Sequence, residues 1–227
     1  MAKEPRENEV KFCVFDLMKI ASCLRELKAR LFLPRTFEVN LRFDVPTGDL
    51  KRTGRVLRLR RDKLARLTYK DNSQNIQGAL TRREIEFVVD DFESARQFIE
   101  ALGYQVAFLY EKYRTTYEYK RTHIMLDELP YGNFVEIEGE LEMLRPIANE
   151  LHLDWDKAIP ASYYALFERL HRSRGLKFRD LTFANCNGRK VSAQDLSIEC
   201  ADSSTPWSKP GQYKRWIIFS FILIYDI

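Results

Sequence analysis

Polar and apolar residues alternate over most of the chain as far as Gly139. A period of two predicts β-strands, because successive side chains on a strand point to opposite faces. Turn-forming residues separate several of the expected strands, for example at Asp62-Lys63 and Pro130-Tyr131-Gly132. Strands are expected over residues 7–15, 35–44, 55–61, 65–70, 82–89, 105–119, 122–127 and 134–139.

Apolar residues three and four positions apart predict helices in four segments. These helices are expected over residues 16–31, 90–102, 140–152 and 162–174. Beyond about residue 177 the periodicity gives way to sequence rich in Asn, Gly, Ser and Pro. We therefore expect one domain over residues 1–183 and a C-terminal extension of unknown role over residues 184–227.

Eight strands with few helices between them favour an α+β fold, a closed antiparallel eight-stranded β-barrel with flanking helices. An open α+β sheet is the alternative, and the number of strands does not separate the two. The distinction matters because only a closed barrel would enclose one face of every strand.

Charged residues of one sign recur at a spacing of two in five of the expected strands. The pairs are Glu7 and Glu9 (followed by Lys11), Arg58 and Arg60, Glu84 and Glu86, Lys112 and Arg114, and Glu136 and Glu138, while Lys70 ends a strand on its own. A solvent-exposed strand face explains any one pair. Charges distributed at random over the surface would, however, mix signs within a pair. The residues between the charges would face the packed side of the sheet: Val10, Leu57, Leu59, Ile85, Tyr113 and Ile137.

Enclosed in a barrel, these pairs would form opposed acidic and basic walls. Burial of so many charges is unfavourable unless each finds a partner. A polyanion carrying a divalent cation supplies both kinds of partner, because phosphoryl oxygens bind Lys and Arg while the cation binds carboxylates. The charge pattern therefore indicates a polyphosphate site inside a barrel.

Composition narrows the range of partners. The net charge of +4 arises from 37 Lys and Arg against 33 Asp and Glu. Because the two signs are nearly balanced, no nucleic-acid partner is expected. The apolar run at 216–225 is shorter than the roughly 20 residues of a membrane helix, so no membrane association is expected. Cys13, Cys23, Cys186 and Cys200 show no CxxC spacing. We therefore expect no disulfide framework and a reduced, cytoplasmic location.

The order of the charged motifs resembles that of the CYTH proteins, also called triphosphate tunnel metalloenzymes. Their ExExK signature matches Glu7-Asn8-Glu9-Val10-Lys11, and the resemblance extends over roughly residues 4–172. The later motifs are Asn40-Leu41-Arg42-Phe43-Asp44, Val56-Leu57-Arg58-Leu59-Arg60, Thr68-Tyr69-Lys70, Arg83-Glu84-Ile85-Glu86, Glu111-Lys112-Tyr113-Arg114, Leu126-Asp127, Gly132-Asn133-Phe134-Val135-Glu136-Ile137-Glu138, Leu151-His152-Leu153 and Ser162-Tyr163-Tyr164-Ala165-Leu166. The ending looks most like the branch of class IV adenylyl cyclases and thiamine triphosphatases. Asp71-Asn72 stands where relatives often have glycine and proline, and the residues after 183 have no counterpart.

This resemblance implies a tunnel that binds a triphosphate along its axis. The residues implied to bind phosphoryl oxygens are Lys11, Arg58, Arg60, Lys70, Lys112 and Arg114. The residues implied to hold one or two Mg²⁺ or Mn²⁺ ions are Glu7, Glu9, Glu136 and Glu138, with Glu84 and Glu86 completing the acidic wall. Glu9, Glu136 and Lys11 are the implied catalytic residues.

The activity implied is metal-dependent hydrolysis of a triphosphate such as tripolyphosphate, ATP or thiamine triphosphate. Adenylyl cyclase activity, which converts ATP to cyclic AMP and pyrophosphate, is the alternative, because the same tunnel electrostatics would serve both reactions. A non-catalytic binder of polyphosphate or RNA 5′ ends is a third option, and the carboxylate pairs argue against it. The oligomeric state stays open, with a homodimer as one option.

Overall fold

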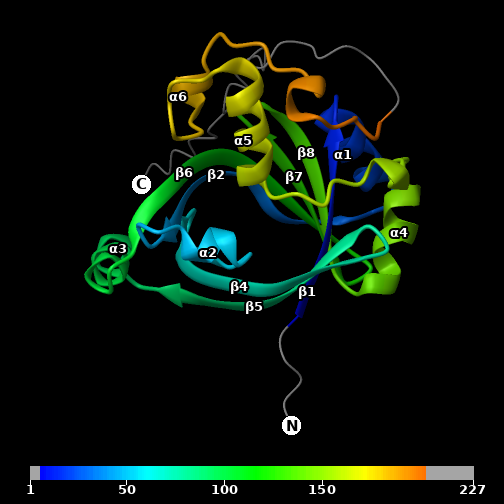
Figure 1. Ribbon diagram of the computed structural model, residues 1–227. Helices are drawn as coiled ribbons and strands as arrows, with labels where there is room; N and C mark the ends of the chain where they lie inside the picture. Colours follow the sequence, from blue (N-terminus) through cyan, green and yellow to red (C-terminus); the bar gives the residue numbers. More distant parts are fainter. Residues whose placement is uncertain (1–5, 203–227) are drawn as a thin grey trace, which may run out of the picture.

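The computed structural model describes residues 6–202, and the apolar run at 216–225 lies outside them. Eight antiparallel strands close into a barrel in the order β1-β5-β4-β3-β2-β6-β7-β8 (Figure 1). Their bounds are β1 Arg6–Val14, β2 Arg30–Asp44, β3 Val56–Arg61, β4 Ala65–Ile76, β5 Ala79–Val89, β6 Gln105–Tyr119, β7 Thr122–Leu129 and β8 Gly132–Glu138. The predicted closed barrel is confirmed, and the open sheet is excluded because β8 pairs with β1.

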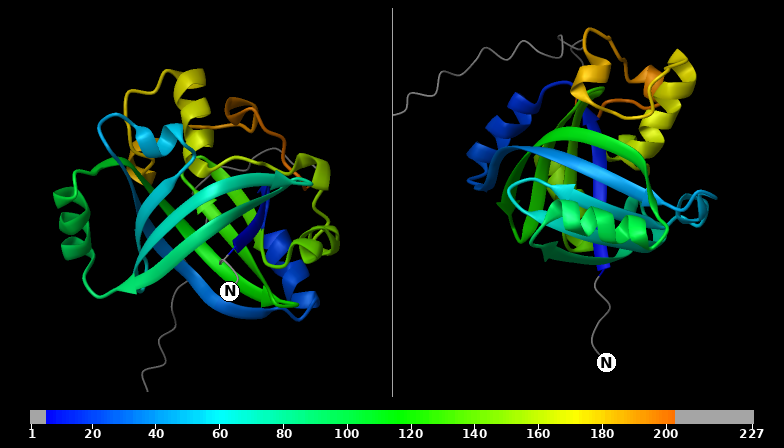
Figure 2. Two further views of the ribbon diagram at one scale, coloured as in Figure 1. Left: turned by 60° about the horizontal axis from the view of Figure 1, so that its bottom comes forward. Right: turned by 90° about the vertical axis from the view of Figure 1, so that its left-hand side faces the viewer.

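The helices flank the barrel. Their bounds are α1 Leu17–Glu26, α2 Asp49–Arg52, α3 Phe92–Ala101, α4 Leu141–Glu150, α5 Tyr163–Arg174 and α6 Phe183–Cys186, with 3₁₀ turns η1 Trp155–Lys157 and η2 Gln194–Leu196. In both views of Figure 2, α5 lies at the end of the barrel opposite to the start of β1. Among the described residues, no helix is long and apolar enough to cross a membrane.

Three predicted boundaries were wrong by several residues. The strand expected over 35–44 begins at Arg30, and the strand expected over 65–70 continues to Ile76. The helix expected over 16–31 ends at Glu26, and Leu31 lies half exposed near the start of β2. Lys28 adopts a left-handed backbone conformation with φ of 59°, which a helix cannot continue through. From Arg30 onward the chain instead pairs with β6, where Arg30 lies opposite Glu118.

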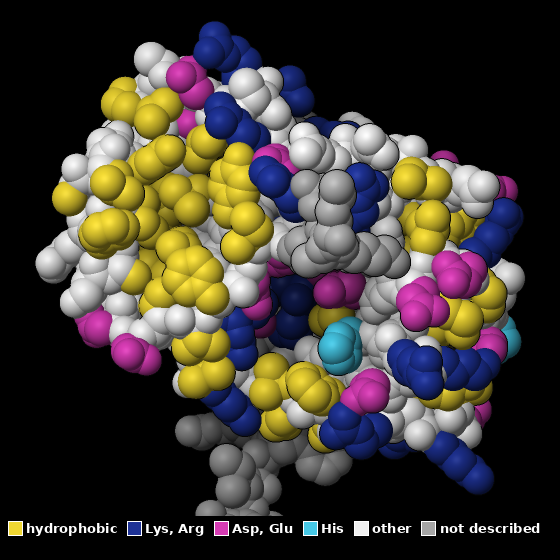
Figure 3. Space-filling view, turned by 90° about the horizontal axis from the view of Figure 1, so that it is seen from below, with side chains coloured by type: hydrophobic (Ala, Val, Ile, Leu, Met, Phe, Trp, Pro, Cys, Tyr) yellow, Lys and Arg dark blue, Asp and Glu magenta, His cyan; other side chains and the backbone are white. Residues whose placement is uncertain are grey.

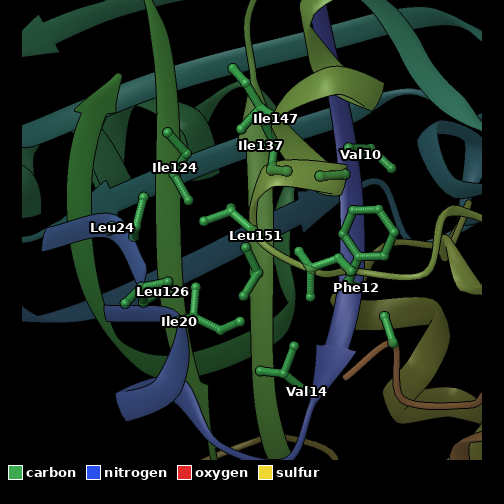
Figure 4. Packing of buried hydrophobic residues seen from close by; sticks show 14 of the residues in the cluster. Val10, Phe12, Val14, Ile20, Leu24, Ile124, Leu126, Ile137, Ile147 and Leu151 are labelled. Atoms are coloured by element: carbon green, nitrogen blue, oxygen red, sulfur yellow. The ribbon is translucent and has the colours of Figure 1, made fainter. Parts of the chain in front are cut away.

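The main hydrophobic core lies outside the barrel, between its wall and the helices. Val10 and Phe12 of β1, Ile137 of β8, Leu24 of α1 and Ile147 of α4 all belong to one buried cluster (Figure 4). Apolar side chains therefore occupy the outer face of these strands and leave the inner face to charged ones. This arrangement is what turns the spacing of two in the sequence into a charged interior.

The outer face is not covered everywhere. Leu59 is fully buried, as predicted, but Ile85 of β5 is 46% exposed. The expectation that Ile85 packs was wrong, because α3 contacts β3 and, within residues 6–202, no helix packs extensively against β5. Phe87, on the same outer face of β5, is also exposed.

A further correction concerns the cysteines. Cys13 of β1 forms a disulfide with Cys200, although the sequence indicated none. The partners lie 187 residues apart, so no local spacing could signal the pair. The carboxylate of Asp202 also accepts hydrogen bonds from the backbone N–H groups of Phe15 and Asp16. Cys200 and Asp202 of the predicted extension thus contact the end of β1 and the residues after it, and the boundary near residue 183 stays a prediction.

Candidate functional site

The barrel encloses a cavity of about 420 Å³. Seen from below, the surface is hollowed, and basic and acidic side chains are visible inside it (Figure 3). All twelve charged residues singled out in the sequence line this cavity: Glu7, Glu9, Lys11, Arg58, Arg60, Lys70, Glu84, Glu86, Lys112, Arg114, Glu136 and Glu138. The structure brings them together, while their individual roles stay predictions.

Four carboxylates and two basic side chains form one group in the cavity, which we call the acidic cluster: Glu7, Glu9, Glu84, Glu138, Lys70 and Arg82. Lys70 Nζ lies 2.6 Å from a Glu7 oxygen and 3.1 Å from Glu84 Oε2. Arg82 Nη2 lies 2.8 Å from Glu9 Oε1 and 3.3 Å from Glu7 Oε2. The carboxylates outnumber the basic groups, so this cluster has excess negative charge.

Glu138 differs from the other members of the acidic cluster. It makes no ion pair with any residue of the described range 6–202. Burial raises the pKa of Glu138 to about 7, and repulsion from Glu7, Glu84 and Glu9 adds to the effect while Lys70 opposes it. A carboxyl group that titrates near neutral pH marks a position where a cation would be favourable.

A second group surrounds Glu136. Its carboxylate lies 3.1 Å from Lys11 Nζ and also bonds Arg114. Burial alone would raise the pKa of Glu136, but the charges of Lys11, Arg114 and Lys112 outweigh it and hold the pKa well below its usual value. Glu136 is therefore ionised at all physiological pH values.

Asp127 is fully buried and bonds basic side chains next to Glu136. It accepts hydrogen bonds from Lys112 Nζ at 3.0 Å, from Arg114 Nε at 2.6 Å and from the Tyr163 hydroxyl at 2.7 Å. Burial and the charge of Asp127 raise the pKa of Tyr163 well above its usual value, so the hydroxyl stays protonated and donates. Asp127 thus fixes two basic side chains of the cavity and ties them to α5.

The arginines of the opposite wall are less fully bonded. Glu86 accepts only long contacts from Arg58 and Arg60, at 3.5 and 3.4 Å. The Nε atoms of Arg58, Arg60 and Arg82 are buried and have no hydrogen-bond partner among the described residues. Buried guanidinium N–H groups normally find acceptors. Arg60 Nε has a long ion contact with Asp62 Oδ2 at 3.6 Å, so the three N–H groups are placed to donate to oxygens of a bound anion.

The sequence analysis gave no site role to several residues of the cavity, although three of them lie in the quoted motifs: Glu38, Arg42, Arg82, Tyr163 and Tyr164. Arg82 carried a usable signal, because it precedes Glu84 by two positions and so shares its strand face. Glu38 and Arg42 also lie an even number of residues apart, but their opposite signs hid them among ordinary surface charges. Tyr163 and Tyr164 reach the cavity from α5, outside any strand pattern.

The CYTH domain matches residues 5–144. The chain belongs to the CYTH domain family. The sequence of this CYTH protein is also similar to that of a Methanocaldococcus jannaschii protein described as a candidate adenylate cyclase. The two are 27% identical over 172 residues, which cover 70% of this chain and 97% of the archaeal one. The family resemblance noted in the sequence is confirmed.

Solved structures share the fold. A protein from Vibrio parahaemolyticus, described as a candidate adenylate cyclase, has a TM-score of 0.64 at 22% identity, covering 71% of this chain and 97% of its own. A candidate adenylyl cyclase from Hippeastrum, described as having a dominant triphosphatase activity, has a TM-score of 0.54 at 18% identity, covering 71% and 95%. At these identities the likeness shows the CYTH fold alone.

Proposed function

We propose that this CYTH protein is a divalent-metal-dependent triphosphatase that hydrolyses inorganic or organic triphosphates inside its barrel. The observation that supports it most directly is the set of unmatched buried donors on Arg58, Arg60 and Arg82. A triphosphate offers many acceptor oxygens in a line, whereas a single small anion would satisfy only one wall of the cavity. The dominant triphosphatase activity described for the Hippeastrum protein is a reason to place hydrolysis first.

Mg²⁺ or Mn²⁺ is the proposed cofactor. Among the described residues, no three Asp, Glu, His or Cys side chains are grouped so as to hold a metal ion. The donor chemistry nevertheless fits, because the acidic cluster offers several hard carboxylate oxygens with excess negative charge. Lys70 bonds both oxygens of Glu7, and Arg82 bonds Oε1 of Glu9, so a cation that takes any of these oxygens must displace a basic group.

The proposed mechanism depends mainly on charge and alignment, as phosphoryl transfer generally does. Lys11, Lys112 and Arg114 would bind oxygens along one side of the triphosphate, and Arg58 and Arg60 along the other. When bound, the divalent ion would supply further charge neutralisation at the reacting phosphoryl group. With its low pKa, Glu136 is a poor proton acceptor and suits orientation of Lys11 and of the attacking water.

Adenylyl cyclase activity is the second candidate. Tyr163, Tyr164 and Arg42 line the cavity on the side of α5, and Arg42 lies 5.1 Å from the centre of the Tyr164 ring. Aromatic and guanidinium planes are surfaces on which a nucleobase can stack. A cyclase would need such a surface to hold the base while the ribose 3′-hydroxyl attacks the α-phosphorus.

Product analysis distinguishes these activities. The purified protein should be incubated with tripolyphosphate, and separately with ATP, in the presence of Mg²⁺ or Mn²⁺. We expect phosphate from tripolyphosphate and no cyclic AMP from ATP. Cyclic AMP with pyrophosphate would assign the cyclase activity instead. Tight triphosphate binding without any product would favour the non-catalytic binder.

The pKa of Glu138 leads to a pH prediction for metal binding. Below about pH 7 a cation must displace the proton of Glu138, so Mn²⁺ affinity should fall about tenfold for each pH unit. Above pH 7 the affinity should level off. Mn²⁺ titrations followed by electron paramagnetic resonance between about pH 5.5 and 8 would measure this. A pH-independent affinity, or the same slope in Glu138→Gln, would contradict the assignment of Glu138.

A further inference from the structure

Arg82 has a place in the cavity that neither the charge pairs nor the motif match assigned. It lies on β5, its side chain is 11% exposed, and it lines the cavity between the β1 carboxylates. The next residue, Arg83, lies on the opposite face of the strand and bonds Asp71. The family motif quoted from the sequence begins at Arg83, so it assigns no role to Arg82.

The contacts of Arg82 divide between two kinds of group. Its Nη2 donates to Glu9 and Glu7, two of the proposed metal ligands. Its Nε has no partner among the described residues, although it is buried. A guanidinium presents several donors in a rigid fork, so one edge can hold a carboxylate while another binds a phosphoryl oxygen. Arg82 therefore contacts the proposed metal ligands and keeps a donor for a phosphoryl oxygen of the substrate.

Charge balance makes Arg82 a competitor of the metal ion. Among the described residues it is the one basic side chain within ion-pairing distance of Glu9. A cation that takes Oε1 of Glu9 would have to displace Arg82 from its shortest ion pair and leave the buried guanidinium with Glu7, 3.3 Å away, as its remaining partner, which is unfavourable. If a triphosphate binds as well, its oxygens replace the carboxylate as the partner of Arg82, and Glu9 is released.

We propose that Arg82 is a positioning residue that couples the two halves of the site, holding Glu7 and Glu9 away from metal until an oxyanion takes its donors. This inference rests on the proposed function. It requires that metal and oxyanion strengthen each other's binding by the same factor, since such coupling is reciprocal. Metal ions would then be recruited mainly when substrate is present.

Mn²⁺ affinity measured by electron paramagnetic resonance tests the proposal without any turnover. Arg82→Gln frees Glu9, so without any added anion this variant should bind Mn²⁺ about tenfold more tightly than the native protein. Inorganic sulfate, which presents oxyanion acceptors but chelates Mn²⁺ weakly, should tighten Mn²⁺ binding in the native protein. The same addition at matched ionic strength should have no such effect on Arg82→Gln.

Two control variants separate this effect from simpler ones. Arg58→Gln removes the same charge from the same cavity without touching Glu7 or Glu9. Arg83→Gln changes the neighbouring residue on the outer face. An equal gain of Mn²⁺ affinity in Arg58→Gln, an unchanged or weaker affinity in Arg82→Gln, or a sulfate effect that persists in Arg82→Gln would overturn the proposal. If the native protein still hydrolyses tripolyphosphate, any of these results would leave the proposed function standing. Failure to bind or cleave any triphosphate would reject that function itself.

Discussion

Replacing Glu136 by glutamine should lower the rate of tripolyphosphate hydrolysis by about 100-fold or more while the barrel stays folded. The ionised carboxylate of Glu136 holds Lys11 and Arg114 in position at the proposed reacting group. Glutamine keeps the size and one acceptor oxygen but removes the charge, so both cations lose an electrostatic anchor. Steady-state phosphate release gives the rate, and circular dichroism checks the fold.

Glu118→Gln is a suitable control for this experiment. Glu118 pairs with Arg30 near the end of β6, where both side chains are exposed and such an ion pair contributes little. It should leave the rate within about twofold of native, which is the scale of a surface change. Glu9→Ala, at a proposed metal ligand, should be as inactive as Glu136→Gln. Near-native rates in both Glu9→Ala and Glu136→Gln would reject the site assignment.

The barrel and its charged lining were predictable because of strict alternation. In an antiparallel barrel every second residue faces inward, so Glu7 and Glu9, or Lys112 and Arg114, needed only to be on strands to share the cavity. The approximate strand positions were enough for this inference. Errors at strand ends, such as the early start of β2, did not change which face a charged residue occupies.

What the sequence could not show is which inward-facing residues contact one another. The pairing of β1 with both β5 and β8 brings Arg82 to Glu9 and Glu136 to Lys11, and this depends on the register between distant strands. The disulfide of Cys13 is equally non-local. Helix α5 contributes Tyr163 through a long connection, so its contact with Asp127 could not be read from periodicity.

Asp127→Asn should lower the free energy of unfolding by about 3 kcal/mol, because it breaks a buried ion-pair group from the acidic side. Lys112 and Arg114 would stay buried with less compensating charge, although Glu38 lies 3.6 Å from Lys112 and Glu136 still bonds Arg114. Urea unfolding of the native and variant proteins measures the difference. Tyr163→Phe removes only one hydrogen bond to the same carboxylate and should cost about 1.5 kcal/mol.

Asp127→Asn should also increase the stabilisation of the fold by a bound anion. With Asp127 neutral, the buried charges of Lys112 and Arg114 lack their closest counter-ion, so a bound polyphosphate replaces a missing partner rather than adding to existing ones. Tripolyphosphate without metal should therefore raise the unfolding midpoint of Asp127→Asn more than that of the native protein or of Tyr163→Phe. An equal shift in all three would mean that Asp127 does not balance the charges that the substrate meets, and that Lys112 and Arg114 serve the fold rather than the ligand.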